Sequence, residues 1–218
     1  MAGEAEDRLP GARPELIPRG PVVVALSGGA DSAVAAWLAV SRSSEVRAVF
    51  VDHGWPGSAA LAVAARAVAA KLAIPLHVVP VERTDTETAA RAARLEILQR
   101  EAAEDPVVTG HHAGDVAETV LANLLRGAGA TGLSGIPAQR APFVRPLLAV
   151  RAAAVRRTAV DLDLPFADDS ANADPGHHRN VIRHVILPGL EEDAPGATDA
   201  LARSASMLGA DDAHLDRL

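Results

Sequence analysis

Residues 22–32 read Val-Val-Val-Ala-Leu-Ser-Gly-Gly-Ala-Asp-Ser, a β-branched run that ends directly in two glycines and short polar side chains. An apolar run of this length is typical of a strand buried on both faces of a parallel sheet. A helix is expected to begin at about Asp31 and to continue through Val40. Strand, glycine turn and helix in this order place residues 27–32 beyond the carboxyl end of the strand, where open parallel sheets bind their ligands.

The turn between this strand and this helix predicts a phosphate-binding loop. Gly28 and Gly29 can take positive φ and carry no side chain, so successive backbone N–H groups can point at phosphate oxygens. The helix adds its unpaired N-terminal N–H groups and the positive end of its dipole. Ser27 and Ser32 supply hydroxyl donors, and Asp31 places a carboxylate where a phosphate-bound Mg²⁺ needs an oxygen ligand. The alternative is a plain tight turn in which Asp31 and Ser32 only cap the helix.

Apolar runs alternate with helical stretches along the chain beyond this loop. Strands are expected over residues 46–51, 76–81 and 107–109, and helices over residues 58–72, from 84–87 to about 103, and 115–126. Strands that alternate with helices of this length favour an α/β fold with a doubly wound parallel sheet and right-handed crossovers. Further helices at 150–162 and 198–218 predict a small helical C-terminal extension.

The pattern divides the chain into three regions. Residues 1–20 are expected to form a flexible tail, because prolines and glycines interrupt any helix there. Residues 21–148 are expected to form the α/β domain, and residues 149–218 a helical extension that completes it. Apolar positions of the last helix need a partner surface, either a further domain or a second copy of the chain in a homodimer: Leu201, Met207, Leu208 and Leu215.

The composition limits the classes of function. The net charge is -7, yet residues 126–184 carry three more basic than acidic residues, so any polyanion site must be local and tRNA binding is expected to be weak, with a shallow salt dependence. There is no cysteine, which excludes disulfides, thiolate metal sites and persulfide chemistry. Arg66 and Lys71 interrupt the most apolar stretch, so no membrane span and a cytoplasmic location are expected.

The loop at residues 27–32 resembles the signature of the PP-loop ATP pyrophosphatases, which cleave ATP between its α and β phosphates and leave AMP on the substrate. It lacks the Walker lysine, so the chemistry implied is adenylation rather than transfer of the γ-phosphoryl group. Further motifs resemble those of the tRNA(Ile)-lysidine synthetase family: VDHG at 51–54, GHHAGDVAET at 110–119, LRGAGATGLSGIP at 125–137, RPLL at 145–148, DSAN at 169–172 and RNVIR at 179–183.

This resemblance implies ATP and Mg²⁺ as cofactors. Residues implied to bind ATP are Ser27, Gly28, Gly29, Ala30, Asp31, Ser32 and His53, with Asp31 also the metal ligand. Residues implied to be catalytic are Asp31, His111, Asp115, Glu118 and Arg179. The implied reaction adenylates the C2 carbonyl oxygen of the wobble cytidine in the anticodon loop of tRNA(Ile). The side-chain amine of L-lysine then attacks C2 and releases AMP. The resemblance also implies further C-terminal tRNA-binding domains that are absent from these 218 residues.

On a helix that begins near Asp115, the side chains of Asp115, Glu118 and Thr119 share one face. We expect the two carboxylates to line the cleft near Asp31, where they would bind the lysine ammonium group or accept its proton. An arginine such as Arg179 would stabilise charge at the α phosphate. The opposite face is expected to bury on the sheet: Val116, Val120, Leu121, Leu124 and Leu125.

Several alternatives stay open at this point. Asp115 and Glu118 can be acidic residues near a helix N-terminus that only interact favourably with the helix dipole. Zinc binding by His111 and His112 is disfavoured, because adjacent histidines rarely converge on one metal. An ATP-dependent tRNA thiolase shares the loop, but a chain without cysteine supplies no persulfide or cluster ligand. The last alternative is a nucleotide-binding module without catalysis.

Overall fold

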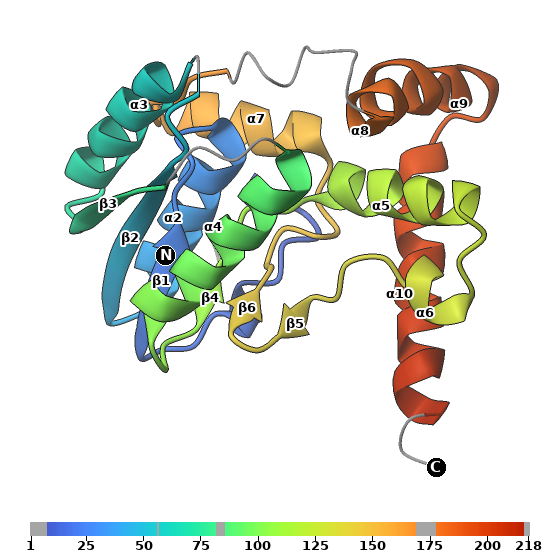
Figure 1. Ribbon diagram of the computed structural model, residues 1–218, viewed down its shortest axis with the longest axis horizontal. Helices are drawn as coiled ribbons and strands as arrows, with labels where there is room; N and C mark the ends of the chain where they lie inside the picture. The colour runs from blue at the N-terminus through green and yellow to red at the C-terminus, as the bar shows by residue number, and fades with distance from the viewer. Residues whose placement is uncertain (1–7, 56, 82–85, 169–177, 216–218) are drawn as a thin grey trace.

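The computed structural model describes residues 8–55, 57–81, 86–168 and 178–215 (Figure 1). Its single sheet has the strand order β3-β2-β1-β4-β6-β5, in which all neighbours are parallel except β5 and β6. The strands are β1 (Pro21–Ala25), β2 (Glu45–Asp52), β3 (Leu76–Pro80), β4 (Val107–Val108), β5 (Gln139–Arg140) and β6 (Phe143–Val144). The prediction of a mostly parallel α/β sheet is therefore confirmed.

The predicted helices are present, and the structure adds a short helix near the N-terminus and further short helices after residue 125. The helices of the first half are η1 (Pro14–Leu16), α2 (Ala30–Arg42), α3 (Ser58–Lys71), α4 (Glu87–Ala102) and α5 (Ala113–Leu125). The later ones are α6 (Ala130–Leu133), α7 (Ala152–Asp161), α8 (His178–Val181), the π-helix η3 (Ile182–Ile186), α9 (Leu187–Asp193) and α10 (Ala197–Leu215). In the part of the chain that the structure describes, no helix is both long and apolar enough to cross a bilayer.

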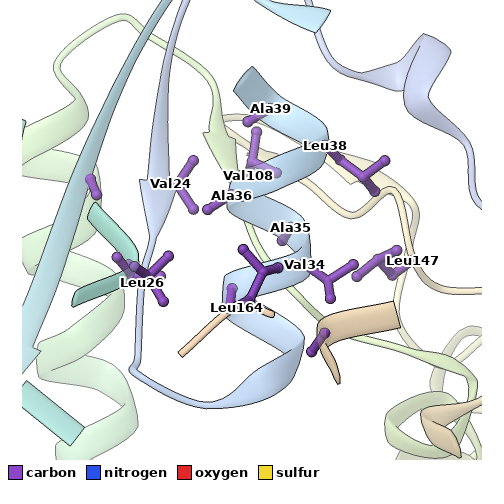
Figure 2. Close-up of a cluster of buried hydrophobic side chains, with 14 of the residues drawn as sticks. Val24, Leu26, Val34, Ala35, Ala36, Leu38, Ala39, Val108, Leu147 and Leu164 are labelled. Carbon is purple, nitrogen blue, oxygen red and sulfur yellow. The ribbon is translucent and has the colours of Figure 1, made fainter. Parts of the chain in front are cut away.

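Both faces of the sheet are covered, which explains the unbroken apolar run in β1. Val22 and Val24 point to one face, where they pack with α2, α3 and α7. Figure 2 shows Val24 next to Ala36 of α2. Val23 points to the other face, where it packs with Leu98 of α4. Alternate side chains of a strand point to opposite faces, so a strand covered on both sides needs apolar residues at every position. α7 belongs to this layer, although the predicted boundary at residue 148 places it in the helical extension.

The expected flexible tail is wrong for its described part, residues 8–20. Leu9 and Ile17 are fully buried in the main core. The backbone N–H of Arg13 also donates to the carbonyl of Pro146 at 2.8 Å. The prolines and glycines of this segment prevent a long helix, but they do not prevent isolated apolar side chains from packing. Residues 1–7 lie outside the described part of the chain.

Helix α5 leaves the sheet and packs against α10 and η3, which corrects the expected burial of its apolar face on the sheet (Figure 1). Val116 and Val120 contact Ala205 of α10, and Leu121 contacts Ile182 of η3. The last positions of the apolar face, Leu124 and Leu125, are 53% and 62% exposed. Helical periodicity identifies which face is apolar, but not which surface covers it.

The last helix is confirmed as α10, and its apolar positions divide into two groups. Leu201 packs against α5 and η3, so part of the expected partner surface is supplied by the chain itself. Met207 and Leu215 are 70% and 66% exposed. The predicted homodimer stays a prediction.

Candidate active site

A cavity of about 880 Å³ opens at the carboxyl ends of β1, β2 and β4, within the roughly 300–1,000 Å³ range of small-molecule sites. The residues with predicted roles that line it are Ser27, Gly29, Ala30, Asp31, Ser32, His53, His111 and Asp115. Gly28, Glu118 and Arg179 lie outside its lining. The chain thus brings the loops after three strands together around one space, as the sequence predicts for an open parallel sheet.

The predicted phosphate-binding loop, residues 27–32, is held in shape by Ser32. The Oγ of Ser32 donates to the carbonyl of Gly29 at 2.9 Å and accepts from the backbone N–H of Ser27 at 3.1 Å. The hydroxyl of Ser27 lies 3.1 Å from the same atom. Only Gly28 takes a positive φ, of 84°, whereas Gly29 is extended and precedes the first turn of α2. The expectation that both glycines use the left-handed region is therefore corrected for Gly29.

The two glycines predict opposite outcomes for the same substitution. At Gly28 a Cβ atom would lie 2.2 Å from the carbonyl oxygen of Leu61 in α3, and the positive φ adds a cost of about 1–3 kcal/mol. At Gly29 a Cβ atom would meet only the Ser27 Oγ, at 3.7 Å. In urea unfolding, Gly28→Ala should therefore lower the free energy of unfolding by more than about 3 kcal/mol. Gly29→Ala should lower it by no more than about 1 kcal/mol. Equal stabilities of the two variants would contradict this description of the loop.

Asp31 points into the cavity with 44% of its side chain exposed. Its Oδ2 lies 3.7 Å from Nε2 of His112. Burial raises the pKa of Asp31, the nearby imidazole of His112 opposes this rise, and the carboxylate of Asp115 adds to it. A cation in the cavity would stabilise the charged form of this partly desolvated carboxylate. The environment of Asp31 therefore suits a ligand of a divalent ion.

His111 is held neutral by its surroundings. Burial lowers its pKa to about 4, and the charges of Arg145, Arg91 and Arg179 act in the same direction, against the opposing charge of Asp115. Its Nδ1 lies 2.8 Å from Oγ1 of Thr109, so this hydroxyl orients the ring. The second ring nitrogen is then available for a hydrogen bond, but a group with this pKa is a weak base at neutral pH.

The neutral His111 predicts a loss of stability on mild acidification. Its folded pKa of about 4 lies below the usual value of 6.5 for histidine, so the unfolded chain binds this proton first as the pH falls. Between these two values the free energy of unfolding should decrease by up to about 1.4 kcal/mol per pH unit from this residue alone. Urea titrations of wild type and His111→Asn from pH 7 to 4.5 should therefore give a flatter profile for the variant. Parallel profiles would contradict the assignment.

The two carboxylates of α5 form an ion-pair cluster with arginines of α8 and η3. Nε of Arg179 donates to Oε2 of Glu118 at 2.6 Å, and Nε of Arg183 donates to Oε1 at 2.5 Å. Asp115 accepts from Nη2 of Arg179 at 2.9 Å. Glu118 is only 2% exposed, so the expectation that it lines the cleft is wrong, whereas Asp115 does line it. Of these two arginines, Arg183 lines the cavity and Arg179 does not.

Asp115 also caps its own helix. Its Oδ2 accepts from the backbone N–H of His112 at 3.0 Å, while Nδ1 of His112 accepts from Gly114 N at 3.1 Å. Burial raises the pKa of Asp115, but the imidazoles of His112 and His111, the hydrogen bond from His112 N and the charge of Arg179 outweigh it, so the pKa is lowered. Among the described residues no three His, Cys, Asp or Glu side chains form a metal-binding group.

Sequence reasoning missed the aromatic and basic parts of the cavity. Trp55 stacks on His53, with the ring centroids 5.2 Å apart. Nε of Arg94 lies 3.4 Å from Nε2 of the same histidine. Burial lowers the pKa of His53, and the charge of Arg94 lowers it further. Six arginines line the cavity: Arg91, Arg94, Arg140, Arg145, Arg156 and Arg183. Two of these arginines have a sequence signal. Arg91 and Arg94 share one face of α4 with Leu95 and Leu98 by their helical spacing.

Comparisons with known proteins agree with this geometry. The PP-loop domain family matches residues 12–190. The tRNA(Ile)-lysidine synthases of Nocardia farcinica and Rhodococcus erythropolis are 43% and 42% identical over 100% and 91% of this chain. The U34-tRNA thiolase NcsA from Methanococcus maripaludis, solved with its [4Fe-4S] cluster, has a TM-score of 0.74 at 22% identity over 95% of this chain and 76% of its own, a likeness that shows the fold alone.

The chain is shorter than the curated relatives that it matches. It spans 69% of the Nocardia farcinica protein and 63% of the Rhodococcus erythropolis protein. The family match over residues 12–190 includes β1, the loop at residues 27–32 and the residues that line the cavity. By the family match and the identity to these relatives, the chain belongs to the tRNA(Ile)-lysidine synthase family of PP-loop proteins.

Proposed function

We propose that the chain uses ATP to join L-lysine to C2 of the wobble cytidine of tRNA(Ile). The observation that carries this proposal is that one cavity holds the phosphate-binding loop, Asp31 and the Asp115 end of the ion-pair cluster. The relatives are named tRNA(Ile)-lysidine synthases, which points to tRNA(Ile) as the substrate and lysidine as the product. Only an unstacked base can reach such a cavity, and an anticodon loop offers one.

Residues 27–32 would hold the phosphates of ATP through backbone N–H groups and the N-terminus of α2. The flat pair of His53 and Trp55 suits contact with the adenine ring. Asp31 suits Mg²⁺, an ion that proteins often bind through one or two carboxylates together with phosphate oxygens and waters. When bound, this ion would neutralise charge on the leaving pyrophosphate.

Lysine binding is assigned to Asp115, because this carboxylate reaches the cavity and Glu118 does not. Glu118 is given a positioning role, since its two oxygens hold Arg179 and Arg183. The role expected of Arg179, contact with the α phosphate, is assigned to Arg183 instead, because Arg183 lines the cavity. His111, neutral at pH 7, would donate or accept a hydrogen bond at the reacting base rather than remove a proton from the amine.

The thiolase alternative is disfavoured by chemistry. The solved thiolase contains a [4Fe-4S] cluster, and such clusters are held by cysteine thiolates. The 218 residues of this chain contain no cysteine. A module that binds ATP without catalysis is the remaining alternative, and a direct assay separates it from the proposed enzyme.

The test uses the purified chain, unmodified tRNA(Ile) transcript, ATP and labelled lysine. We expect labelled lysine in the RNA, with one AMP and one pyrophosphate released for each lysine incorporated. A transcript of a different tRNA should take up no label. Binding of ATP without release of pyrophosphate in the complete mixture would favour the non-catalytic module and overturn the proposal.

A further inference from the structure

One wall of the cavity gathers arginines from two elements that are distant in sequence. On α4, Arg91 and Leu98 lie seven positions apart and so share the face that lines the cavity. On the β5–β6 hairpin, Arg140 pairs with Phe143 across the strands, and paired residues project from the same side. Arg145 follows Phe143 by two positions and therefore lies on that side as well.

Phe143 brings the two elements together. Its ring packs in the same buried cluster as Ile97 and Leu98 of α4. The guanidinium carbon of Arg145 lies 5.6 Å from the centroid of this ring. The backbone N–H of Arg145 donates to the carbonyl of Ala138 at 2.9 Å, which extends the hairpin ladder by one residue and fixes the position of Arg145. The side chains of Arg140 and Arg145 thus face α4 across the apolar floor that Phe143 forms.

Arg140 and Arg145 differ in their partners from Arg156 and Arg183, which also line the cavity. Arg156 is paired with Asp168, and Arg183 with Glu118. Neither Arg140 nor Arg145 contacts a carboxylate among the described residues, and Nη1 of Arg145 donates only to the carbonyl of Pro137, at 2.8 Å. Burial lowers the pKa of Arg145, and the charges of Arg91 and Arg140 lower it further, so both of these guanidinium groups repel that of Arg145. Cations that converge in this way are stabilised by an anion between them.

The wall is separate from the loop that would hold the phosphates of ATP. That loop leads into α2, which packs on one face of the sheet, whereas α4 and Phe143 pack on the other. In the sheet, β4 and β6 lie between β1 and β5. Arg94 is left out of the group, because its Nε lies 3.4 Å from His53 and so belongs to the side where the nucleotide base is expected.

We propose that Arg91, Arg140 and Arg145 form a binding site for consecutive backbone phosphates of single-stranded RNA next to the base that enters the cavity. The proposal rests on the proposed function for the identity of the RNA. The guanidinium fork binds phosphate oxygens in pairs, and phosphate contacts of this kind fix the register of a nucleic acid without reading its sequence. The site therefore recognises the backbone on either side of the wobble base and leaves base selection to the cavity.

The experiment compares Arg140→Gln/Arg145→Gln with Arg66→Gln, a control on α3 outside the cavity lining that also removes positive charge. Two RNA probes are titrated over a range of KCl by fluorescence anisotropy: the anticodon stem-loop of tRNA(Ile) and an oligouridylate. With about 0.7 in slope for each phosphate contact to a single strand, the double variant should lower the slope of log affinity against log salt by about 1.4 for both probes. Arg66→Gln should keep the wild-type slope, and affinity for ATP, measured by calorimetry, should stay within about twofold in all variants.

Each outcome decides the proposal. An unchanged RNA slope with weaker ATP binding would show that these arginines hold the triphosphate instead, and an equal change in Arg66→Gln would show a general effect of charge; either overturns the site. If the double variant does not fold, Arg140→Gln alone, at an exposed position, should lower the slope by about 0.7. Because the oligouridylate is no substrate for lysine transfer, a slope change with this probe supports the phosphate site even if wild type incorporates no lysine into tRNA(Ile).

Discussion

Replacement of Asp31 by asparagine is expected to lower the rate of pyrophosphate release by about 100-fold or more, since a bound metal ion contributes several kcal/mol to transition-state stabilisation and 1.36 kcal/mol corresponds to a factor of ten. Asp31 lines the cavity at the predicted phosphate-binding loop, and its Oδ2 lies 3.7 Å from Nε2 of His112. Asparagine keeps the shape of the side chain but removes the negative charge that a divalent ion requires.

The same substitution separates function from stability. Burial raises the pKa of Asp31, so the folded protein disfavours its charged form, and the neutral asparagine should leave the free energy of unfolding unchanged or higher. Asp161→Asn, at an exposed position of α7 outside the cavity, is the matched control and should keep wild-type turnover. The measurement is pyrophosphate release in the presence of tRNA(Ile) and lysine, together with urea unfolding. Wild-type release by Asp31→Asn would exclude Asp31 as a metal ligand.

The first half of the fold could be predicted because its signals are local. A five-residue apolar strand, two glycines and a helix start are contiguous at residues 21–32, and the structure has β1 and the start of α2 there. The β5–β6 hairpin was missed because each strand is two residues long, which is too short for a period of two to appear, and Pro142 lies between them. The π-helix η3 has no separate sequence signal, since its apolar pattern continues into α9.

The candidate site shows the same limit at the level of side chains. The i, i+3 spacing correctly places Asp115 and Glu118 on one face of α5, but the surface that meets this face comes from residues 179 and 183, more than 60 positions away. Whether a carboxylate faces a cavity or an arginine depends on that tertiary contact and not on the helix period. For the same reason the sequence alone does not connect Arg91 of α4 with Arg140 and Arg145, because the contact of Phe143 with α4 brings them to one cavity.

Replacement of Glu118 by glutamine is expected to destabilise the fold by about 3 kcal/mol, at the lower end of the values for breaking a buried ion pair. Both oxygens of Glu118 accept hydrogen bonds from guanidinium groups, and its side chain is 2% exposed. The amide keeps the volume but leaves the charges of Arg179 and Arg183 without their main partner. Because these arginines are 31% and 30% exposed, solvent recovers part of the loss, and the lower end of the range applies.

The matched control is Glu192→Gln, at an exposed position of α9, which should change the free energy of unfolding by less than about 0.5 kcal/mol. A double-mutant cycle of Glu118→Gln with Arg183→Met then isolates the pair, and residues that share such a network give coupling energies of about 0.5–3 kcal/mol. If Glu118 acts only by holding Arg183 at the cavity, Glu118→Gln should slow pyrophosphate release no further once Arg183→Met is present. The double variant should then be as slow as Arg183→Met alone, and the two losses should not multiply. Multiplicative losses together with a coupling energy near zero would show that the two residues act separately, and that the carboxylate has a role at the reacting atoms despite its burial.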